Sequence, residues 1–247
     1  MTDLQAILDK GGPWQQARII GDQLLIQGDC LEVMPTLPRV DAVVTDPPYG
    51  IGIAARGRSG GGGTASAKWR GAVAVNYTAS DWDAVAPDAA VSNAVAMAPN
   101  SIVWGGNYFT LGASSCWLVW DKETNGNLAD CELAWTNLPG AVRLIRHLWN
   151  GFARKGGEER HGHPTQKPIA LMEWCLGFLP DARTILDPFM GSGTTLAACQ
   201  RLGRQGIGIE LDPDYYAIAC KRVQEVVNNP PLFTIAPPKP TQDKMDL

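Results

Sequence analysis

The sequence predicts an α/β protein in which helices cover a mostly parallel sheet. The clearest observation is that strand and helix patterns alternate between residues 183 and 227. Such alternation is typical of parallel strands joined by crossover helices. Composition is the second observation: 247 residues, of which 45% are apolar and 19% charged, suit a globular protein with one large domain.

The first part of the chain contains short strands that end in polar turns. Residues 23–27 predict a strand that runs into a Gly-Asp turn, and a helical turn is expected over 31–37. Residues 40–45 predict a buried strand, because they are short, rich in valine and flanked by turn formers. This strand ends at Asp46. Residues 1–22 are interpreted as an N-terminal extension.

The remaining elements follow in order along the chain. A helix is expected within residues 84–97, starting near Pro87, and Pro168 is expected to open another that runs through Phe178, since proline suits a first helical turn. Further strands are expected near 101–104, 116–120, 131–136 and 143–149. The final series is expected to consist of strand 183–186 ending at Asp187, helix 192–202, strand 205–209 ending at Glu210, and helix 213–227.

A glycine-rich turn between a strand and a helix is the first candidate binding site. Between Asp187 and Thr195 it reads DPFMGSGTT, in which Gly191 and Gly193 would let the backbone approach a ligand closely. Glu210 ends the next strand, where an acidic side chain can bind the hydroxyl groups of a ribose. A nucleoside-containing cofactor is therefore predicted. The motif here is GxGxxL and not the GxGxxG typical of dinucleotide binding, which disfavours a dinucleotide. A purely structural turn is the alternative.

The segment Asp46-Pro47-Pro48-Tyr49 is the second candidate site, also at a strand end. Its prolines fix their own backbone angles and offer no N–H donor. The Asp46 carboxylate and the Pro47 carbonyl remain as acceptors, and Tyr49 adds a flat aromatic face. Acceptors beside an aromatic plate suit the exocyclic amino group of a planar base. A proline-rich turn with a capping aspartate is the structural alternative.

Three motifs in one order carry a family resemblance: Asp46–Tyr49, His163–Pro168 (HPTQKP) and Asp187–Thr195. They resemble the amino-group DNA methyltransferases, and specifically the permuted beta group, in which the catalytic motif precedes the cofactor motif. The resemblance implies a Rossmann-like methyltransferase fold with a circularly permuted motif order. It implies a catalytic domain over residues 23–227, followed by a Pro-rich tail over 228–247.

The resemblance also implies a cofactor and a set of site residues. The cofactor is S-adenosyl-L-methionine, and the expected reaction is methyl transfer to the N6 amino group of a flipped-out adenine. The residues assigned to catalysis are Asp46, Pro47, Pro48 and Tyr49. Those assigned to the cofactor are Asp29, Thr165, Lys167, Asp187, Phe189, Gly191, Ser192, Gly193, Thr194 and Glu210. For Lys167, a solvated lysine at a helix start is the alternative.

Basic residues gather in two loop-like segments. Residues 50–80 carry +4 and residues 143–168 also carry +4, so the remainder must carry −12 for the chain to reach −4. Such segments can neutralise DNA phosphates. We expect a mobile loop over 53–70 and target recognition within 122–160, with double-stranded DNA as the partner. The candidate DNA contacts are Arg56, Arg58, Lys68, Arg70, Arg154 and Lys155.

Several alternatives remain open at this point. An N4-cytosine DNA methyltransferase would use the same apparatus. Enzymes that methylate RNA or a protein glutamine use a related Pro-Pro-Tyr loop, but the motif order and the segment His163–Pro168 argue against them. A DNA-binding module without turnover is a candidate of another class. The six cysteines and three histidines lack metal-ligand spacing, so no metal is expected. No apolar run reaches membrane-spanning length, and a cytoplasmic protein is expected. A homodimer is possible by resemblance, and any restriction nuclease would be a separate chain.

Overall fold

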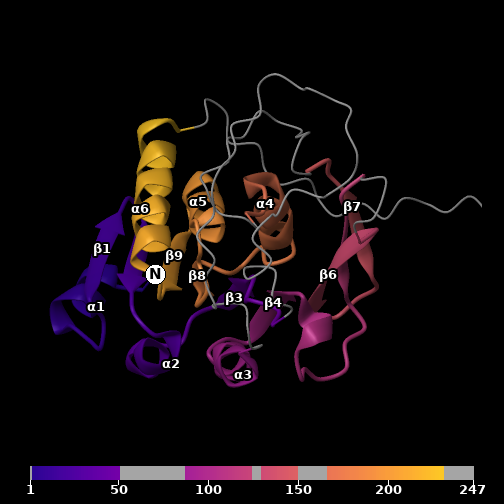
Figure 1. The fold of residues 1–247 in the computed structure, drawn as a ribbon, viewed down its shortest axis with the longest axis horizontal. Coiled ribbons are helices and arrows are strands. Elements are labelled where there is room, and N and C mark those ends of the chain that lie inside the picture. Colours follow the sequence, from indigo (N-terminus) through magenta and orange to yellow (C-terminus); the bar gives the residue numbers. More distant parts are fainter. Residues whose placement is uncertain (1, 51–86, 124–128, 150–165, 231–247) are drawn as a thin grey trace, which may run out of the picture.

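A single sheet forms the centre of the molecule. The computed structural model describes residues 2–50, 87–123, 129–149 and 166–230, and within them nine strands pair in the order β1-β2-β9-β8-β3-β4-β6-β5-β7 (Figure 1). The strands are β1 (Gln16–Ile20), β2 (Gln23–Gln27), β3 (Ala42–Thr45), β4 (Asn100–Trp104), β5 (Leu118–Asp121), β6 (Cys131–Thr136), β7 (Arg143–Arg146), β8 (Thr184–Asp187) and β9 (Gln205–Glu210).

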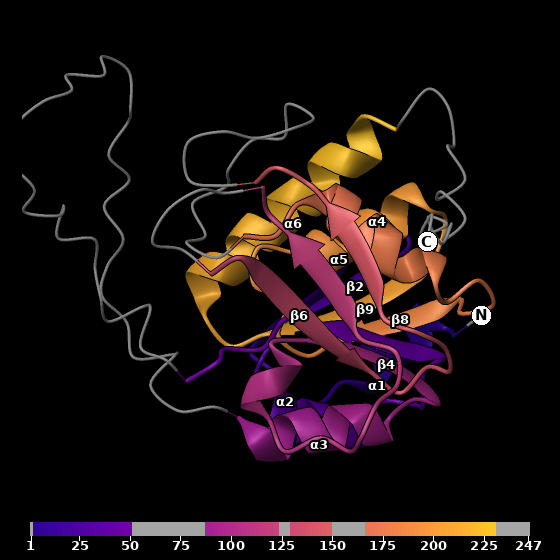
Figure 2. The same ribbon diagram turned by 90° about the vertical axis from the view of Figure 1, so that its right-hand side faces the viewer.

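Helices cover both faces of this sheet. The α-helices are α1 (Leu4–Lys10), α2 (Cys30–Val33), α3 (Asp88–Ala96), α4 (Ile169–Gly177), α5 (Thr194–Arg201) and α6 (Pro213–Asn228), with 3-10 turns η1 (Met34–Thr36) and η2 (Gly106–Tyr108). Figure 2 shows α4, α5 and α6 on one face and α2 and α3 on the other. No helix in the described part of the chain is long and apolar enough to cross a membrane.

The central strands are parallel, as the sequence predicts. Strand β8 pairs in parallel with β9 and β3, and the parallel set extends to β2 and β4. After β8 the chain passes through α5 to β9, whereas after β3 it returns through α3 on the opposite face to β4. The connections therefore diverge between β3 and β8, which is where ligands bind in open α/β sheets.

The side chains of each central strand point alternately to the two faces of the sheet, which explains why the core has two layers. Ala42 and Val44 of β3 pack in one buried cluster with Leu171 of α4. Val43 points to the other face and packs in a cluster with Val33 of α2. Because successive strand side chains point to opposite faces, a fully apolar strand is the pattern that a sheet covered on both sides requires.

The structure departs from the sequence expectations near the N-terminus. Residues 1–22 contain α1 and β1, and β1 pairs antiparallel with β2, so part of this segment belongs to the sheet. The helical turn expected over 31–37 is split into α2 and η1. Pro35 lies within η1 and has no N–H to continue an α-helix. β7 ends at Arg146, earlier than the expected residue 149.

Candidate active site

The two predicted loops lie side by side at the carboxyl edge of the sheet. Strands β3 and β8 are direct neighbours, and each loop starts where its strand ends. The hydroxyl group of Thr45 donates a hydrogen bond of 2.7 Å to Oδ1 of Asp187. Burial raises the pKa of Asp187 to about 6, against the hydrogen bonds that stabilise its ionised form. Asp187 thus connects the glycine loop to the strand that leads to Asp46.

Asp46 is held by two donors. The hydroxyl group of Tyr49 donates to Oδ1 at 2.8 Å, and Nζ of Lys167 lies 2.5 Å from Oδ2. Burial raises the pKa of Asp46, while the Lys167 ammonium opposes that rise. Pro47 is buried directly beside it. The carboxylate is therefore fixed in orientation before any substrate arrives, which is the condition for electrostatic preorganisation.

Tyr49 forms part of an aromatic stack. Its ring lies 5.0 Å from that of Tyr108, with an angle of 12° between the planes, and Tyr108 is 45% exposed. A Cβ atom on Gly105 would lie only 2.1 Å from the Tyr49 ring, so glycine is required where the two segments meet. Tyr108 was not among the residues predicted for this site. A planar ring can therefore stack on Tyr49, and Tyr108 does so here.

Lys167 is not a solvated residue, so that alternative is wrong. Its side chain is 5% exposed, and besides Asp46 it forms an ion pair of 3.1 Å with Glu132. Burial acts to lower the pKa of Lys167, but the two carboxylates outweigh it and raise the pKa. Its ammonium group lies on the Asp46 side of the site.

Glu132 and Lys122 complete this group of charges, and sequence reasoning missed both. Glu132 lies on β6, Lys122 follows the end of β5, and the two form an ion pair. Neither residue belongs to a recognisable motif. Their approach to Asp46 depends on β6 pairing antiparallel with β4, which no local pattern reveals.

The glycine loop leads into the N-terminus of α5. Gly191 and Gly193 have φ angles of 50° and 76°, which favour glycine. A Cβ atom on Gly193 would lie 3.1 Å from Cβ of Ala219 on α6. The loop thus packs tightly against the helix layer and presents its backbone at the sheet edge.

Glu210 lies beside this loop and is bound to it by a hydrogen bond. It accepts hydrogen bonds from the N–H groups of Gly191 at 2.9 Å and Asp212 at 2.8 Å. Burial raises the pKa of Glu210 to about 7, with both hydrogen bonds opposing the rise. Asp29 follows β2, whose last residue pairs with Glu210, and its side chain caps α2 by accepting from Leu31 N–H. The two carboxylates therefore come from adjacent strand ends.

Other residues predicted for the cofactor face the protein interior. The hydroxyl groups of Ser192 and Thr194 accept hydrogen bonds from Arg222 of α6, at 3.0 and 2.7 Å. Arg222 is 2% exposed and also donates to the Ser192 carbonyl. Phe189 packs against the apolar cluster that contains Trp135. Arg222 is thus a loop-supporting residue that the sequence did not suggest.

Some predicted residues lie outside the described part of the chain. They are Thr165, the candidate DNA contacts Arg56, Arg58, Lys68, Arg70, Arg154 and Lys155, and the whole proposed loop over 53–70. Of the target-recognition region 122–160, the described residues include β6 and β7, which are strands of the main sheet. Within the described ranges, no group of three or more His, Cys, Asp or Glu could hold a metal ion.

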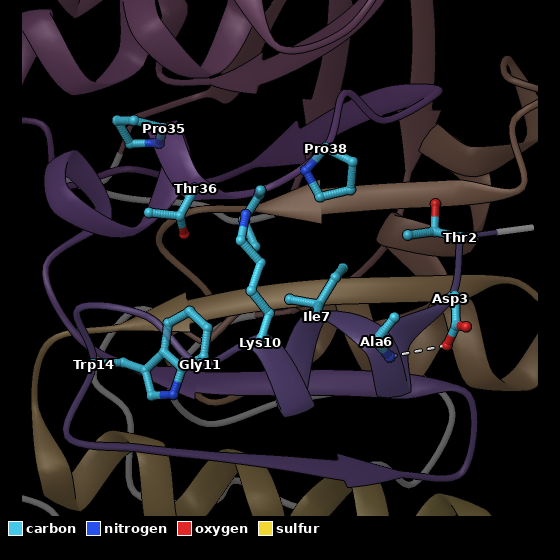
Figure 3. Close-up of a pocket in the computed structure, with 11 residues that line it drawn as sticks. Thr2, Asp3, Ala6, Ile7, Lys10, Gly11, Trp14, Pro35, Thr36 and Pro38 are labelled. Atoms are coloured by element: carbon cyan, nitrogen blue, oxygen red, sulfur yellow. Dashed lines mark hydrogen bonds between the residues drawn. The ribbon is translucent and has the colours of Figure 1, made fainter.

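A pocket of about 650 Å³ lies elsewhere, between α1 and the 3-10 turn η1. Figure 3 shows Ile7, Lys10, Trp14 and Pro35 around it, and Asp3 capping α1 through Ala6 N–H. None of the residues predicted for catalysis or for the cofactor lines this pocket. The candidate active site is therefore defined by the loops that follow β3 and β8, and not by this pocket.

Comparison with known proteins assigns the fold to a class. The structure resembles PvuII DNA methyltransferase (cytosine-N4-specific), with a TM-score of 0.54, 14% identity, and coverage of 87% of this chain and 94% of that chain. At that identity the likeness shows the fold, an α/β methyltransferase fold.

Sequence comparison then gives the family. Residues 113–221 match the N6_N4_Mtase family, described as DNA methylase. The putative methylase YubD of Escherichia coli (strain K12) is 31% identical over 210 residues, covering 81% of this chain and 90% of that protein. The chain belongs to this family of DNA methylases. It is also 44% identical over 84 residues to type II methyltransferase M2.DpnII of Streptococcus pneumoniae, a match that spans 33% of this chain and 31% of that relative.

Proposed function

We propose that this protein transfers a methyl group from S-adenosylmethionine to the exocyclic N6 amino group of adenine in double-stranded DNA. The observation that carries the proposal is the fixed Asp46 carboxylate at the end of β3, directly beside the glycine loop at the end of β8. These positions allow an amino group and a cofactor to meet between β3 and β8, where the described connections of the sheet diverge.

Asp46 and Pro47 would act on the amino group. An adenine amino nitrogen is a weak nucleophile because its lone pair is delocalised into the ring. Hydrogen bonds from this amino group to the Asp46 carboxylate and the Pro47 carbonyl favour a tetrahedral nitrogen with an available lone pair. The reaction then depends on positioning and electrostatics, without a covalent enzyme intermediate.

The target base must leave the duplex to reach Asp46, at a cost of a few kcal/mol. Stacking on Tyr49 would offset part of this cost. In the structure the ring of Tyr108 already stacks on that of Tyr49, with 5.0 Å between the ring centroids. We propose that the flipped base stacks on Tyr49 and that Tyr108 rearranges to admit it.

The residues around Gly191 fit the cofactor. When bound, S-adenosylmethionine supplies an electrophilic methyl group on its sulfonium. The backbone at Gly191 and Gly193 would lie under the methionine portion, and Asp29 would approach the adenine. Each Glu210 oxygen accepts a single backbone N–H, so lone pairs remain for the ribose hydroxyls. Ser192 and Thr194 would contribute through their backbone, because their hydroxyl groups bind Arg222.

Methyl transfer can be tested with cofactor labelled on its methyl group. Protein is incubated with labelled S-adenosylmethionine and, separately, duplex DNA, RNA or a bacterial protein extract. We expect label in DNA alone. Label in RNA or protein would redirect the proposal to those amino groups, and its absence from all three would leave a binding module without turnover.

N4-cytosine transfer is the second candidate. The family name covers both amino groups, and the structural neighbour PvuII methyltransferase is described as cytosine-N4-specific. Aspartate at the first position of the catalytic motif favours adenine by family habit. Digestion of the labelled DNA separates the two, since the label elutes with N6-methyladenine nucleoside in one case and N4-methylcytosine nucleoside in the other.

We further propose that the basic segments contact DNA phosphates. Each of the segments 50–80 and 143–168 carries +4 in a chain of net charge −4. Replacing Arg56, Arg58, Lys68 and Arg70 together by glutamine is expected to reduce the salt slope of DNA binding by about 3 to 4, since each released counterion contributes about 0.9. The measurement is fluorescence anisotropy of labelled duplex over a salt series. An unchanged slope would contradict phosphate contact by residues 50–80.

Glu210 is expected to make cofactor affinity and stability respond oppositely to pH. Its folded pKa of about 7 lies above the ordinary 4.5, so between these values the folded protein binds the extra proton. Stability of the free protein should therefore rise as pH falls from 7 towards 4.5, by at most about 1.4 kcal/mol per pH unit. Cofactor affinity should fall over the same range, because ribose hydroxyls donate best to the ionised carboxylate.

Calorimetric titration and urea denaturation of the wild type and Glu210→Gln measure the two effects. The glutamine variant should bind the cofactor weakly at every pH and should lose the Glu210 share of the pH dependence. The pKa of Asp187 is also raised, so both proteins should keep a smaller pH dependence of stability with the same sign. Identical pH profiles for the two proteins would contradict the role of Glu210.

A further inference from the structure

Four charged side chains meet next to the catalytic loop and form a chain of ion pairs. In order they are Asp46, Lys167, Glu132 and Lys122. Nζ of Lys167 lies 2.5 Å from Asp46 and 3.1 Å from Glu132, so one ammonium group bridges two carboxylates. The group carries two positive and two negative charges and is neutral as a whole.

Aromatic side chains surround these charges. Nζ of Lys167 lies 5.6 Å from the ring centroid of Trp104, and Nζ of Lys122 lies 4.8 Å from that of Trp120. Both tryptophans are buried. The Lys167 side chain is 5% exposed and the other three charged side chains are 20–24% exposed. Because water reaches the four charges only in part, their interactions are stronger than those of fully exposed charges, and removing one charge affects its neighbours in the chain.

The bridging ammonium affects how well Asp46 can accept a hydrogen bond. If Lys167 paired with Asp46 alone, the ammonium would neutralise the carboxylate that must bind the target amino group. Glu132 attracts the same ammonium from the other side. Lys167 is therefore shared between the two carboxylates, and the ionised Asp46 carboxylate keeps more of its capacity to accept a further hydrogen bond.

We propose that Glu132 is a positioning residue for methyl transfer, because it competes with Asp46 for the Lys167 ammonium and so keeps Asp46 oriented and able to accept the target amino group. This inference rests on the proposed function. It assigns a role to a side chain from β6, outside the three motifs of the family resemblance.

The charged and titratable groups described beside Asp46 each favour or disfavour its ionised form. Lys167 favours the ionised carboxylate, as does the hydrogen bond from Tyr49, and Glu132 disfavours it. The carboxylate of Asp187 is occupied by Thr45 and the Phe189 N–H, and it interacts unfavourably with Asp46. Removal of Glu132 should thus ease ionisation of Asp46, and removal of Lys167 should hinder it.

Two variants test the proposal through the pH dependence of kcat. Glu132→Gln is expected to lower kcat by about 10-fold, since it removes one charged partner from the network. It should also move the acidic limb of the pH profile of kcat to lower pH. Lys167→Met should also lower kcat but move that limb to higher pH. KM for S-adenosylmethionine should stay within about 2-fold in Glu132→Gln, because the change acts through Asp46.

The controls separate positioning from structural damage. Glu225→Gln removes a carboxylate of α6 whose side chain is 45% exposed, and this variant should behave as the wild type. Glu132→Asp restores the charge and should recover part of kcat and the position of the acidic limb. The proposal would be overturned if the acidic limb moved in the same direction in Glu132→Gln and Lys167→Met, or did not move in either. It would also be overturned if kcat of Glu132→Gln equalled that of Glu225→Gln.

A measurement on the unchanged protein covers the case in which a variant does not fold. Burial acts to raise the pKa of Glu132, but Lys167 and Lys122 outweigh burial and lower this pKa to about 2. Carboxyl ¹³C NMR of the wild type should show Glu132 ionised well below pH 4, and titration in the ordinary range would overturn the bridge. Wild-type protein that shows this low pKa but transfers no methyl to DNA would refute the proposed function; transfer with an ordinary pKa would refute the bridge alone.

Discussion

Replacing Asp46 by asparagine is expected to lower kcat for DNA methylation by about 10²–10³-fold, the usual cost of removing one preorganised electrostatic contact from a transition state. Asparagine keeps the shape of the side chain but exchanges a charged acceptor for an amide. The developing positive charge on the target nitrogen then loses its anionic partner. Rates with saturating DNA and cofactor, together with cofactor Kd from calorimetry, measure the effect.

The cofactor Kd of Asp46→Asn should stay within about 3-fold of wild type, because Asp46 contacts Tyr49 and Lys167 and not the glycine loop. Asp121→Asn serves as the matched control, since Asp121 pairs with an Arg146 side chain that is 70% exposed. This control should retain the wild-type rate. Turnover by Asp46→Asn at the wild-type rate would refute the mechanism.

Replacing Arg222 by methionine is expected to give the largest loss of stability, about 3 kcal/mol, since hydrogen bonds from a buried charged donor disappear. Nη1 of Arg222 donates to Ser192 and Thr194, the residues around Gly193. Their hydroxyl groups would remain buried without this donor. Because the same bonds fix the glycine loop, cofactor affinity should fall as well.

Urea denaturation gives the free energy of unfolding, and calorimetry gives the cofactor affinity. Arg201→Met is the control, because Arg201 also lies on the helix layer but is 37% exposed and pairs only with Glu173 among its described ion pairs. It should lose less than about 1 kcal/mol and bind the cofactor normally. Equal losses in Arg222→Met and Arg201→Met would show that Arg222 does not support the loop.

The central sheet could be predicted from sequence because its signals are local. Short valine- and isoleucine-rich runs end at Asp46, Asp187 and Glu210, and each of the three strands appears in the structure close to its expected bounds. The edge strand β1 was missed. Its sequence QARII is short, and only its last residue is buried, so little hydrophobic periodicity marks it.

The electrostatics of the site could not be predicted, because they depend on contacts between distant segments. The resemblance assigns Lys167 to the cofactor, with a solvated lysine at a helix start as the alternative. Its ion pair with Glu132 depends on β6 pairing with β4, which the sequence does not reveal. Arg222 likewise lies in an amphipathic helix, where arginine usually faces solvent. Tertiary contacts therefore decide the burial and the partners of these two side chains.

The central claim is that Asp46 presents an adenine amino group to the cofactor methyl. Mass spectrometry of nucleosides from duplex DNA methylated in a single turnover tests it most directly, with wild type and Asp46→Asn compared side by side. The account predicts that N6-methyl-2′-deoxyadenosine accumulates with the wild type and forms at least about 100-fold more slowly with Asp46→Asn. The absence of this nucleoside from DNA treated with the wild-type protein would contradict the claim, as would equal rates for the two proteins.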